Sequence, residues 1–227
     1  NVYEVPVSTV HLDMYRGYSY SRSQMFRKEP DMYVTVKCLL DMLRECGPTE
    51  TQRKQEALQK LVACTSVPSA SQTMPLGAFQ WETDFGQLLE PVMECIAADD
   101  TDVILQVTAN VLIKNLVMHY PEHCNAYIRP LVRCLLGGCN SSLKEVSHSA
   151  DEGLLELVTT LQPSACLDCV VEELNAKPKN AQILIRLLGK LASEVDPAEL
   201  QQKVPLFMAA LYEGFKHRSA DVRKSVV

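Results

Sequence analysis

Apolar residues in the last part of the chain recur at the spacing of one helix face. Between residues 204 and 215 they fall three or four positions apart, as in an amphipathic helix: Val204, Phe207, Met208, Leu211, Tyr212 and Phe215. A polar break at residues 217–220 follows, and Asp221 can then cap a second helix whose apolar face holds Val222, Val226 and Val227. Two short antiparallel helices do not bury both faces alone, so the pattern predicts stacking on copies of itself.

The same helix–turn–helix pattern occurs four times earlier in the chain. The predicted pairs are 31–47 with 53–64, 84–98 with 102–119, 121–137 with 143–161, and 163–176 with 181–195. Asp196-Pro197 opens the fifth pair, since proline suits the first helical turn. After the first pair the starts lie about 40 residues apart, the period of HEAT-type repeats. The sequence therefore predicts an all-α fold, an α-solenoid of about five HEAT-type helix pairs.

The repeats are expected to occupy residues 30–227, with the last repeat truncated. Residues 1–29 are rich in Tyr, Ser and Arg and lack a sustained helical period, so they are interpreted as an N-terminal arm or linker. A Ser-, Thr-, Pro- and Gln-rich loop is expected over residues 65–80, closed by Trp81, with Thr83 or Asp84 capping the next helix. The chain lacks an initiator methionine, which suggests a piece of a longer protein with further residues after the fifth pair.

Composition narrows the class of protein. The chain is 47% hydrophobic and 22% charged, which is typical of a soluble globular domain. Its net charge of −6 argues against general nucleic-acid affinity, which needs a basic footprint. It contains neither a run of about 18 apolar residues nor a signal peptide, so no membrane insertion is expected. Most of the nine cysteines lie in apolar helical runs and are expected to be buried, reduced thiols, which favours a cytoplasmic location.

Few residues suggest chemistry. Cys166 and Cys169 have the spacing of a metal or redox motif, but they lie in an apolar helix without a second pair, so packing is the favoured interpretation. His119 and His123 are separated by Pro121 at a helix junction, which removes the spacing of a metal site on one helix face. The chain also lacks a phosphate-binding glycine loop and a nucleophile elbow. We therefore expect no enzyme activity, no cofactor and no metal.

The turns inside the helix pairs remain as candidate binding features. In a solenoid of helix pairs these turns line one edge, which forms an extended docking strip. The second turn, Asp99 to Thr101, is acidic, whereas the fourth and fifth turns and the helix that follows them are basic. The candidate partner-binding residues, predicted to meet an acidic partner, are Lys177, Lys179, His217, Arg218, Arg223 and Lys224. The alternative is that they are ordinary solvated turn residues.

The order of these features resembles a TOG domain of the CLASP family of microtubule regulators, and more narrowly their C-terminal domain. The resemblance covers about residues 20–227 and rests on Met25-Phe26, Trp81-Glu82, residues 121–127, Lys144-Glu145-Val146 and residues 221–225. It implies a protein that stabilises microtubules, with this domain recruiting it through partner proteins to kinetochores, plus ends, the cell cortex or the Golgi. The implied location is the cytoskeleton: microtubules, spindle and kinetochore.

The first turn departs from the tubulin-binding members of that family. Those domains resemble one another in placing a tryptophan in the first intra-pair turn and basic residues in later turns. Residues 47–52 contain no tryptophan here, and the second turn is acidic. These departures favour kinetochore, plus-end or cortical adaptor proteins as partners. The alternative is a tubulin-binding TOG domain that promotes microtubule rescue or stabilisation, and it is motivated by the basic fourth and fifth turns.

Overall fold

The computed structural model describes residues 36–46, 50–66, 81–97, 102–176, 179–216 and 219–226, in which the chain is helical without a strand. The first helices of the pairs are α1 (Val36–Glu45), α3 (Trp81–Ala97), α6 (Ile128–Cys139), α8 (Pro163–Asn175) and α10 (Pro197–Phe215). The second helices are α2 (Thr51–Thr65), α4 (Val103–His119), α7 (Lys144–Thr160), α9 (Ala181–Ala192) and α11 (Ala220–Ser225). Two short elements precede α6: α5 (Pro121–Cys124) and the 3-10 helix η2 (Asn125–Tyr127).

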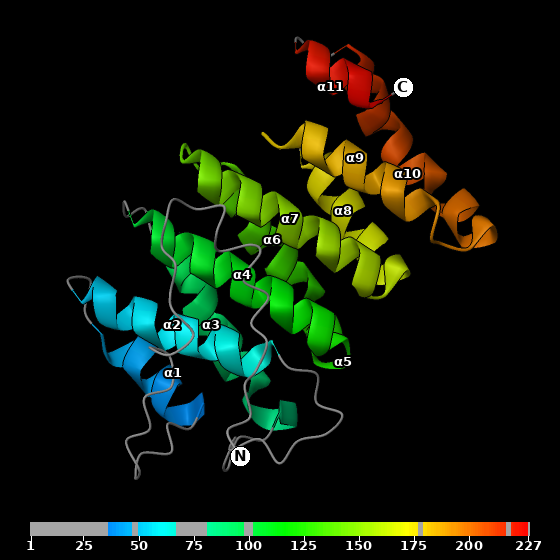
Figure 1. The fold of residues 1–227 in the computed structure, drawn as a ribbon. Coiled ribbons are helices and arrows are strands. Elements are labelled where there is room, and N and C mark those ends of the chain that lie inside the picture. Colours follow the sequence, from blue (N-terminus) through cyan, green and yellow to red (C-terminus); the bar gives the residue numbers. More distant parts are fainter. Residues whose placement is uncertain are drawn as a thin grey trace.

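The helices stack in two layers, with α2, α4, α7 and α9 side by side in front of α3, α6 and α8 (Figure 1). Each first helix packs against its own second helix and against the first helix of the next pair, and the second helices form an equivalent row. The fold runs in chain order from blue α1 to red α11 (Figure 1). The predicted α-solenoid of helix pairs is therefore confirmed over the described residues.

One continuous apolar core runs between the layers from Leu39 in α1 to Val222 in α11. The apolar residues that the spacing places on inner faces are buried, including Leu58 of α2 and Leu154 of α7, which are completely inaccessible. Each helix pair alone would leave one face of this core in water. Burial of apolar area between successive pairs therefore stabilises the stack as a unit.

Several helix starts differ from the sequence prediction. The helix predicted over 121–137 is divided into α5, η2 and α6, which begins at Ile128. Helix α3 begins at Trp81, so Thr83 and Asp84 lie in its first turn and not at its N-cap. Helix α11 has Ser219 at its N-cap, in an extended conformation, so Asp221 also lies inside the helix. Acidic residues are favoured in a first turn as well as at a cap, because the helix N-terminus carries partial positive charge. Two helix starts agree with the prediction. Helix α4 follows Asp102, whose carboxylate accepts a hydrogen bond from Leu105 N at 3.0 Å, and Pro197 follows the N-cap Asp196.

The apolar stripe of α10 is only partly buried. Phe207 is buried, and Val204 and Leu211 are half-buried, as expected for a stripe that faces the core. Met208, Tyr212 and Phe215 are 50%, 58% and 51% exposed and lie on the outer side of the helix. Helices α8, α9 and α11 contact α10, and the buried Gly214 faces Ile185 of α9. The neighbouring helices therefore cover only part of the apolar stripe of α10, and the rest is exposed to solvent.

Several sequence predictions lie outside the described residues. These are the arm at residues 1–29, the domain start at residue 30 and nearly all of the loop at 65–80. The same holds for the turn residues Asp99 to Thr101.

Candidate functional site: the turn edge

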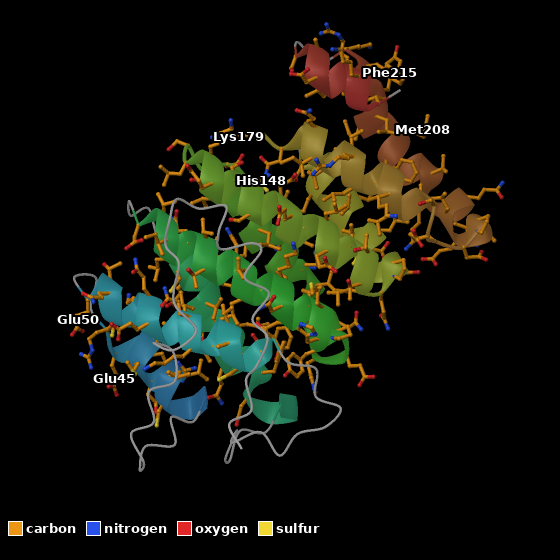
Figure 2. The ribbon with its side chains drawn as sticks, in the orientation of Figure 1. Glu45, Glu50, His148, Lys179, Met208 and Phe215 are labelled. Atoms are coloured by element: carbon orange, nitrogen blue, oxygen red, sulfur yellow. The ribbon has the colours of Figure 1, made fainter. Side chains whose placement is uncertain are left out.

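The ends of first helices and the starts of second helices lie along one edge of the solenoid, called here the turn edge. Figure 2 shows Glu45 and Glu50 near one end of this edge, by α1 and α2, and Lys179 farther along it, at the start of α9. Because successive pairs stack in register, residues from distant parts of the sequence share this edge. The single edge of turns that the sequence predicts therefore exists as a structural feature.

Polar contacts between successive second helices hold the turn edge together. Gln55 Nε2 donates to Asp102 Oδ2 at 2.7 Å, which joins α2 to the start of α4. In the next step the buried Asn110 of α4 donates through Nδ2 to Ser149 Oγ of α7 at 2.9 Å. Buried hydrogen bonds of this kind specify which residues face each other, because a slip would leave polar groups unpaired.

The turn of the fourth pair is anchored to the turn of the third. Asn180 is buried and donates through Nδ2 to the carbonyl oxygen of Leu136 in α6 at 2.8 Å. Asn140 donates to the same carbonyl oxygen at 3.1 Å. Lys179 precedes this anchor and is exposed, so the fold presents its ammonium group to solvent. Sequence reasoning overlooked Asn180: an Asn directly before a helix signals a turn or a cap, but not a contact with a residue 44 positions away.

The predicted partner-binding residues divide into two groups. Lys179, Arg223 and Lys224 are exposed side chains, on the turn before α9 and on α11. Lys177, His217 and Arg218 lie outside the described residues. Lys216, which the sequence analysis did not single out, is exposed at the end of α10, and its Nζ lies 4.0 Å from the centroid of the Tyr212 ring. The described residues thus place these four cations at the fourth and fifth turns and on α11.

The first two pairs give the opposite charge to their part of the turn edge. Glu45, Glu50 and Glu56 are acidic residues of α1 and the start of α2, and Asp102 caps α4. Among the cations nearby, Arg53 is paired with Glu50, with 2.8 Å between Nη1 and Oε1, and this bond raises the pKa of the Arg53 guanidinium. Arg44 and Lys54 also lie here, so the first turn is close to neutral and the acidic excess comes from the second turn, residues 99–102. The charge of the turn edge therefore changes from neutral or acidic at α1–α4 to basic at α9–α11.

Cys166 and Cys169 lie inside the core. Both thiols are buried on α8, and burial raises the pKa of Cys166 to about 12 and that of Cys169 to about 11. A neutral, buried thiol acts as a small apolar group, because thiolate is the form that binds metal or reacts. Within the described part of the chain, no cluster of three or more His, Cys, Asp or Glu side chains could hold a metal ion. These surroundings favour the packing interpretation over the metal or redox alternative.

The helix pairs and the turn edge define an α-solenoid, a class of protein that binds partners over an extended surface. Its fold is similar to the crystal structure of the MAST/Orbit N-terminal domain, with a TM-score of 0.61 and 16% identity over 83% of this chain and 78% of that one. At this identity the similarity shows the fold alone. No family model matches the chain.

Known sequences similar to this chain are CLIP-associating proteins. The chain is 25% identical to the CLIP-associated protein of Arabidopsis thaliana over 199 residues, which cover 87% of this chain and 13% of the relative. It is 23% identical to CLIP-associating protein 1-A of Xenopus laevis over 149 residues, or 65% of this chain and 10% of the relative. These relatives confirm the resemblance to the CLASP family and indicate no catalytic function. None of the described helices is long and apolar enough to cross a membrane.

Proposed function

We propose that this chain is a non-catalytic protein-interaction domain of a microtubule-stabilising protein of the CLASP type. Its role is to recruit that protein through partners at kinetochores, plus ends, the cell cortex or the Golgi. The observation that carries the proposal is the division of charge along the turn edge, with an acidic second turn and a group of exposed cations at the fourth and fifth pairs. A partner with a local acidic segment meets Lys179, Arg223 and Lys224 there.

The acidic first half of the edge supports a protein adaptor over tubulin. A tubulin-binding TOG domain faces an acidic surface with its early turns, and Glu45, Glu50 and Asp102 would repel such a surface. Because the relatives are named as CLIP-associated, a CLIP protein is the first partner to test.

Tubulin binding is the second candidate, because the basic end suits an acidic surface of any kind. The two candidates separate in one experiment: gel filtration of the chain with tubulin dimer or with a purified CLIP protein at low salt. We expect co-elution with the CLIP protein and none with tubulin. Low salt favours charge pairing, so the absence of a tubulin complex under these conditions is informative.

Charge reversal at the basic end identifies the surface. We expect Lys179→Glu with Arg223→Glu to weaken CLIP binding about tenfold, since exposed charges each contribute modestly to affinity. The matched control is Lys60→Glu on the exposed side of α2, which changes one charge of the same sign far from the basic end. Co-elution with tubulin that the double reversal abolishes would favour the second candidate. If this double variant binds the CLIP protein as tightly as the unaltered chain does, the basic end is not the binding site.

A further inference from the structure

Two segments of the chain carry opposite charge without any compensating residue. Residues 82–102 contain seven acidic residues and no Lys or Arg. Residues 16–28 contain Arg16, Arg22, Arg27 and Lys28 and no Asp or Glu. The acidic segment includes α3 and the cap of α4, whereas the basic segment precedes α1. Acidic and basic residues are therefore concentrated in separate segments, which the net charge of −6 does not reveal.

The acidic part of the turn edge contains a hollow. It has a volume of about 500 Å³ and lies between the first turns of α2 and the start of α4, lined by Thr51, Gln52, Gln55, Glu56, Gln59 and Asp102. Asp102 Oδ1 accepts from Leu105 N and Oδ2 accepts from Gln55 Nε2, so the carboxylate is oriented by two neutral donors. The hollow thus joins a fixed carboxylate to three glutamine side chains.

The carboxylates of this hollow differ from those that join successive helix pairs. Between successive pairs, carboxylates meet cations: Lys114 pairs with Glu152, Arg133 with Glu173, and Lys203 with Asp168. Glu56 and Asp102 form no ion pair with any residue that the structure describes. The negative charge of the hollow is therefore left for a cation from outside the described helices.

An arginine side chain would supply the positive charge and the N–H donors that match the acceptors of this hollow. A guanidinium is planar and carries five N–H donors, and the wall of the hollow offers carboxylate and amide oxygens as acceptors. Residues 16–28 supply three arginines within 13 residues, interleaved with Ser and Tyr. An extended segment of this kind can place one guanidinium in the hollow and others beside the exposed Glu45 at the end of α1.

The segment is tethered within reach of the hollow. Val36, the start of α1, follows Lys28 by eight positions, and an extended chain over eight positions spans up to about 27 Å. Helix α1 has 10 residues, so its length is about 15 Å, and it packs directly on α2. The tether is therefore longer than the path along α1 to the turn edge.

We propose that the basic segment 16–28 docks intramolecularly on the acidic half of the turn edge, with an arginine guanidinium in the hollow between Glu56 and Asp102. Tethering replaces a bimolecular encounter with a high effective concentration, so a few exposed ion pairs suffice. Docking neutralises the α1–α4 end of the edge and leaves the basic end open for an acidic partner. The contact is independent of the partner proposed above.

Limited trypsin digestion of the full chain tests this contact, because trypsin cuts after the same four cations. The rate of cleavage after residues 16, 22, 27 and 28 is followed by mass spectrometry at 50 mM and 500 mM salt. We compare the unaltered chain with a Glu56→Lys, Asp102→Asn variant; asparagine keeps the helix cap while removing its charge. The matched control is Glu122→Lys with Glu145→Lys, two exposed acidic residues on α5 and α7. Circular dichroism verifies that all variants are folded.

We expect the variant, and high salt, to raise cleavage in segment 16–28 roughly five- to thirtyfold, as expected when a few exposed ion pairs are lost together. The control pair leaves the rate unchanged at low salt. Three outcomes overturn the proposal: rapid cleavage of the unaltered chain at low salt, protection that survives Glu56→Lys with Asp102→Asn, and protection that disappears on dilution. The last result assigns the hollow to a basic segment of a second copy.

Discussion

At the scale of single residues, two adjacent glycines in α6 have opposite structural roles. A Cβ atom at Gly138 would lie 2.9 Å from Ala150 Cβ of α7 and 3.4 Å from Ile96 Cγ2 of α3. A Cβ atom at Gly137 would meet nothing within 4 Å. Gly138 therefore sets how closely the third pair packs against its neighbours, whereas Gly137 only lowers helix propensity.

Substitution of these glycines by alanine should change stability in opposite directions. We expect Gly138→Ala to lower the free energy of unfolding by about 1–3 kcal/mol, because neither Ala150 nor the backbone can move away cheaply. Gly137→Ala should raise it by up to about 1 kcal/mol through helix propensity. Urea denaturation followed by circular dichroism measures both, and Gly137→Ala is the control for the methyl group itself. Equal effects of the two changes would contradict the close approach of α6 and α7.

The buried cysteines give a second prediction at this scale. Burial raises the pKa of the Cys124 and Cys134 thiols to about 12, as it does for Cys166. Because thiolate is the reactive form, these side chains should resist iodoacetamide at pH 8 in the folded chain and react in denaturant. Mass spectrometry of alkylated peptides reads out each residue, and the exposed Cys38 is the internal comparison. Rapid native labelling of Cys166 or Cys169 would contradict the packing interpretation of that motif.

At the scale of helices, one lysine joins α8 to α10. Lys203 Nζ lies 2.7 Å from Asp168 Oδ1 and 2.7 Å from Glu199 Oε1. Hydrogen bonds from Lys203 and then Ser164 lower the pKa of Glu199 below its ordinary value of 4.5. Burial alone would lower the pKa of Lys203, but its bonds to Asp168 and Glu199 outweigh burial and raise that pKa.

The direction of these pKa shifts predicts when the contact is lost. A carboxylate with a lowered pKa contributes stability that is present above pH 4.5 and disappears as pH falls through its pKa in the folded state. The contribution of Lys203 is complete below pH 10.5 and is lost only in strong alkali. We expect Lys203→Met to lower Tm at pH 7 by about 2 °C, and the difference to shrink toward pH 3. Lys190→Met is the control, since Lys190 pairs with Glu194 only one turn away.

The sequence predicts which segments are helical more accurately than it predicts where each helix begins. Periodicity indicated every helix pair, because side-chain direction repeats every 3.6 residues whatever the neighbours are. The starts of α3 and α11 were wrong by a few residues, because Thr, Asp and Ser stabilise both an N-cap and a first turn. The helix start predicted at residue 102 was correct. There the Asp102 carboxylate both caps α4 and accepts a hydrogen bond from Gln55 of α2.

At the scale of the whole molecule, the outer side of α10 is an apolar surface. Met208, Tyr212 and Phe215 follow one another at helical spacing, and each is half exposed or more (Figure 2 labels Met208 and Phe215). Contiguous apolar surface of this kind promotes association, whereas a single exposed apolar residue such as Leu155 does not.

This surface should make the chain associate as its concentration rises. We expect its weight-average sedimentation coefficient to increase between about 5 and 200 μM, and the increase to disappear in a Met208→Gln, Phe215→Gln variant. Leu155→Gln, at a residue that is 44% exposed on α7, is the control and should leave the concentration dependence unchanged. A chain that stays monomeric over this range would contradict the prediction.

The candidate site was only partly accessible from the sequence. Lys179, Arg223 and Lys224 could be assigned to one edge because the order of helices and turns implies it. The anchor of Asn180 on Leu136 and the hollow between Gln55 and Asp102 could not, because each joins residues more than 40 positions apart. Contacts of that range depend on how closely the helix pairs approach each other.

By itself, the sequence determined the helical repeat, the inner faces of the helices and the reversal of charge along the turns. All three are local properties, because they follow from residue type and the 3.6-residue period. Only the tertiary structure decided that Gly138 and not Gly137 touches a neighbouring helix, and that Phe207 is buried while Met208 is exposed. Those distinctions depend on what lies opposite each face, which is set by packing between segments far apart in the chain.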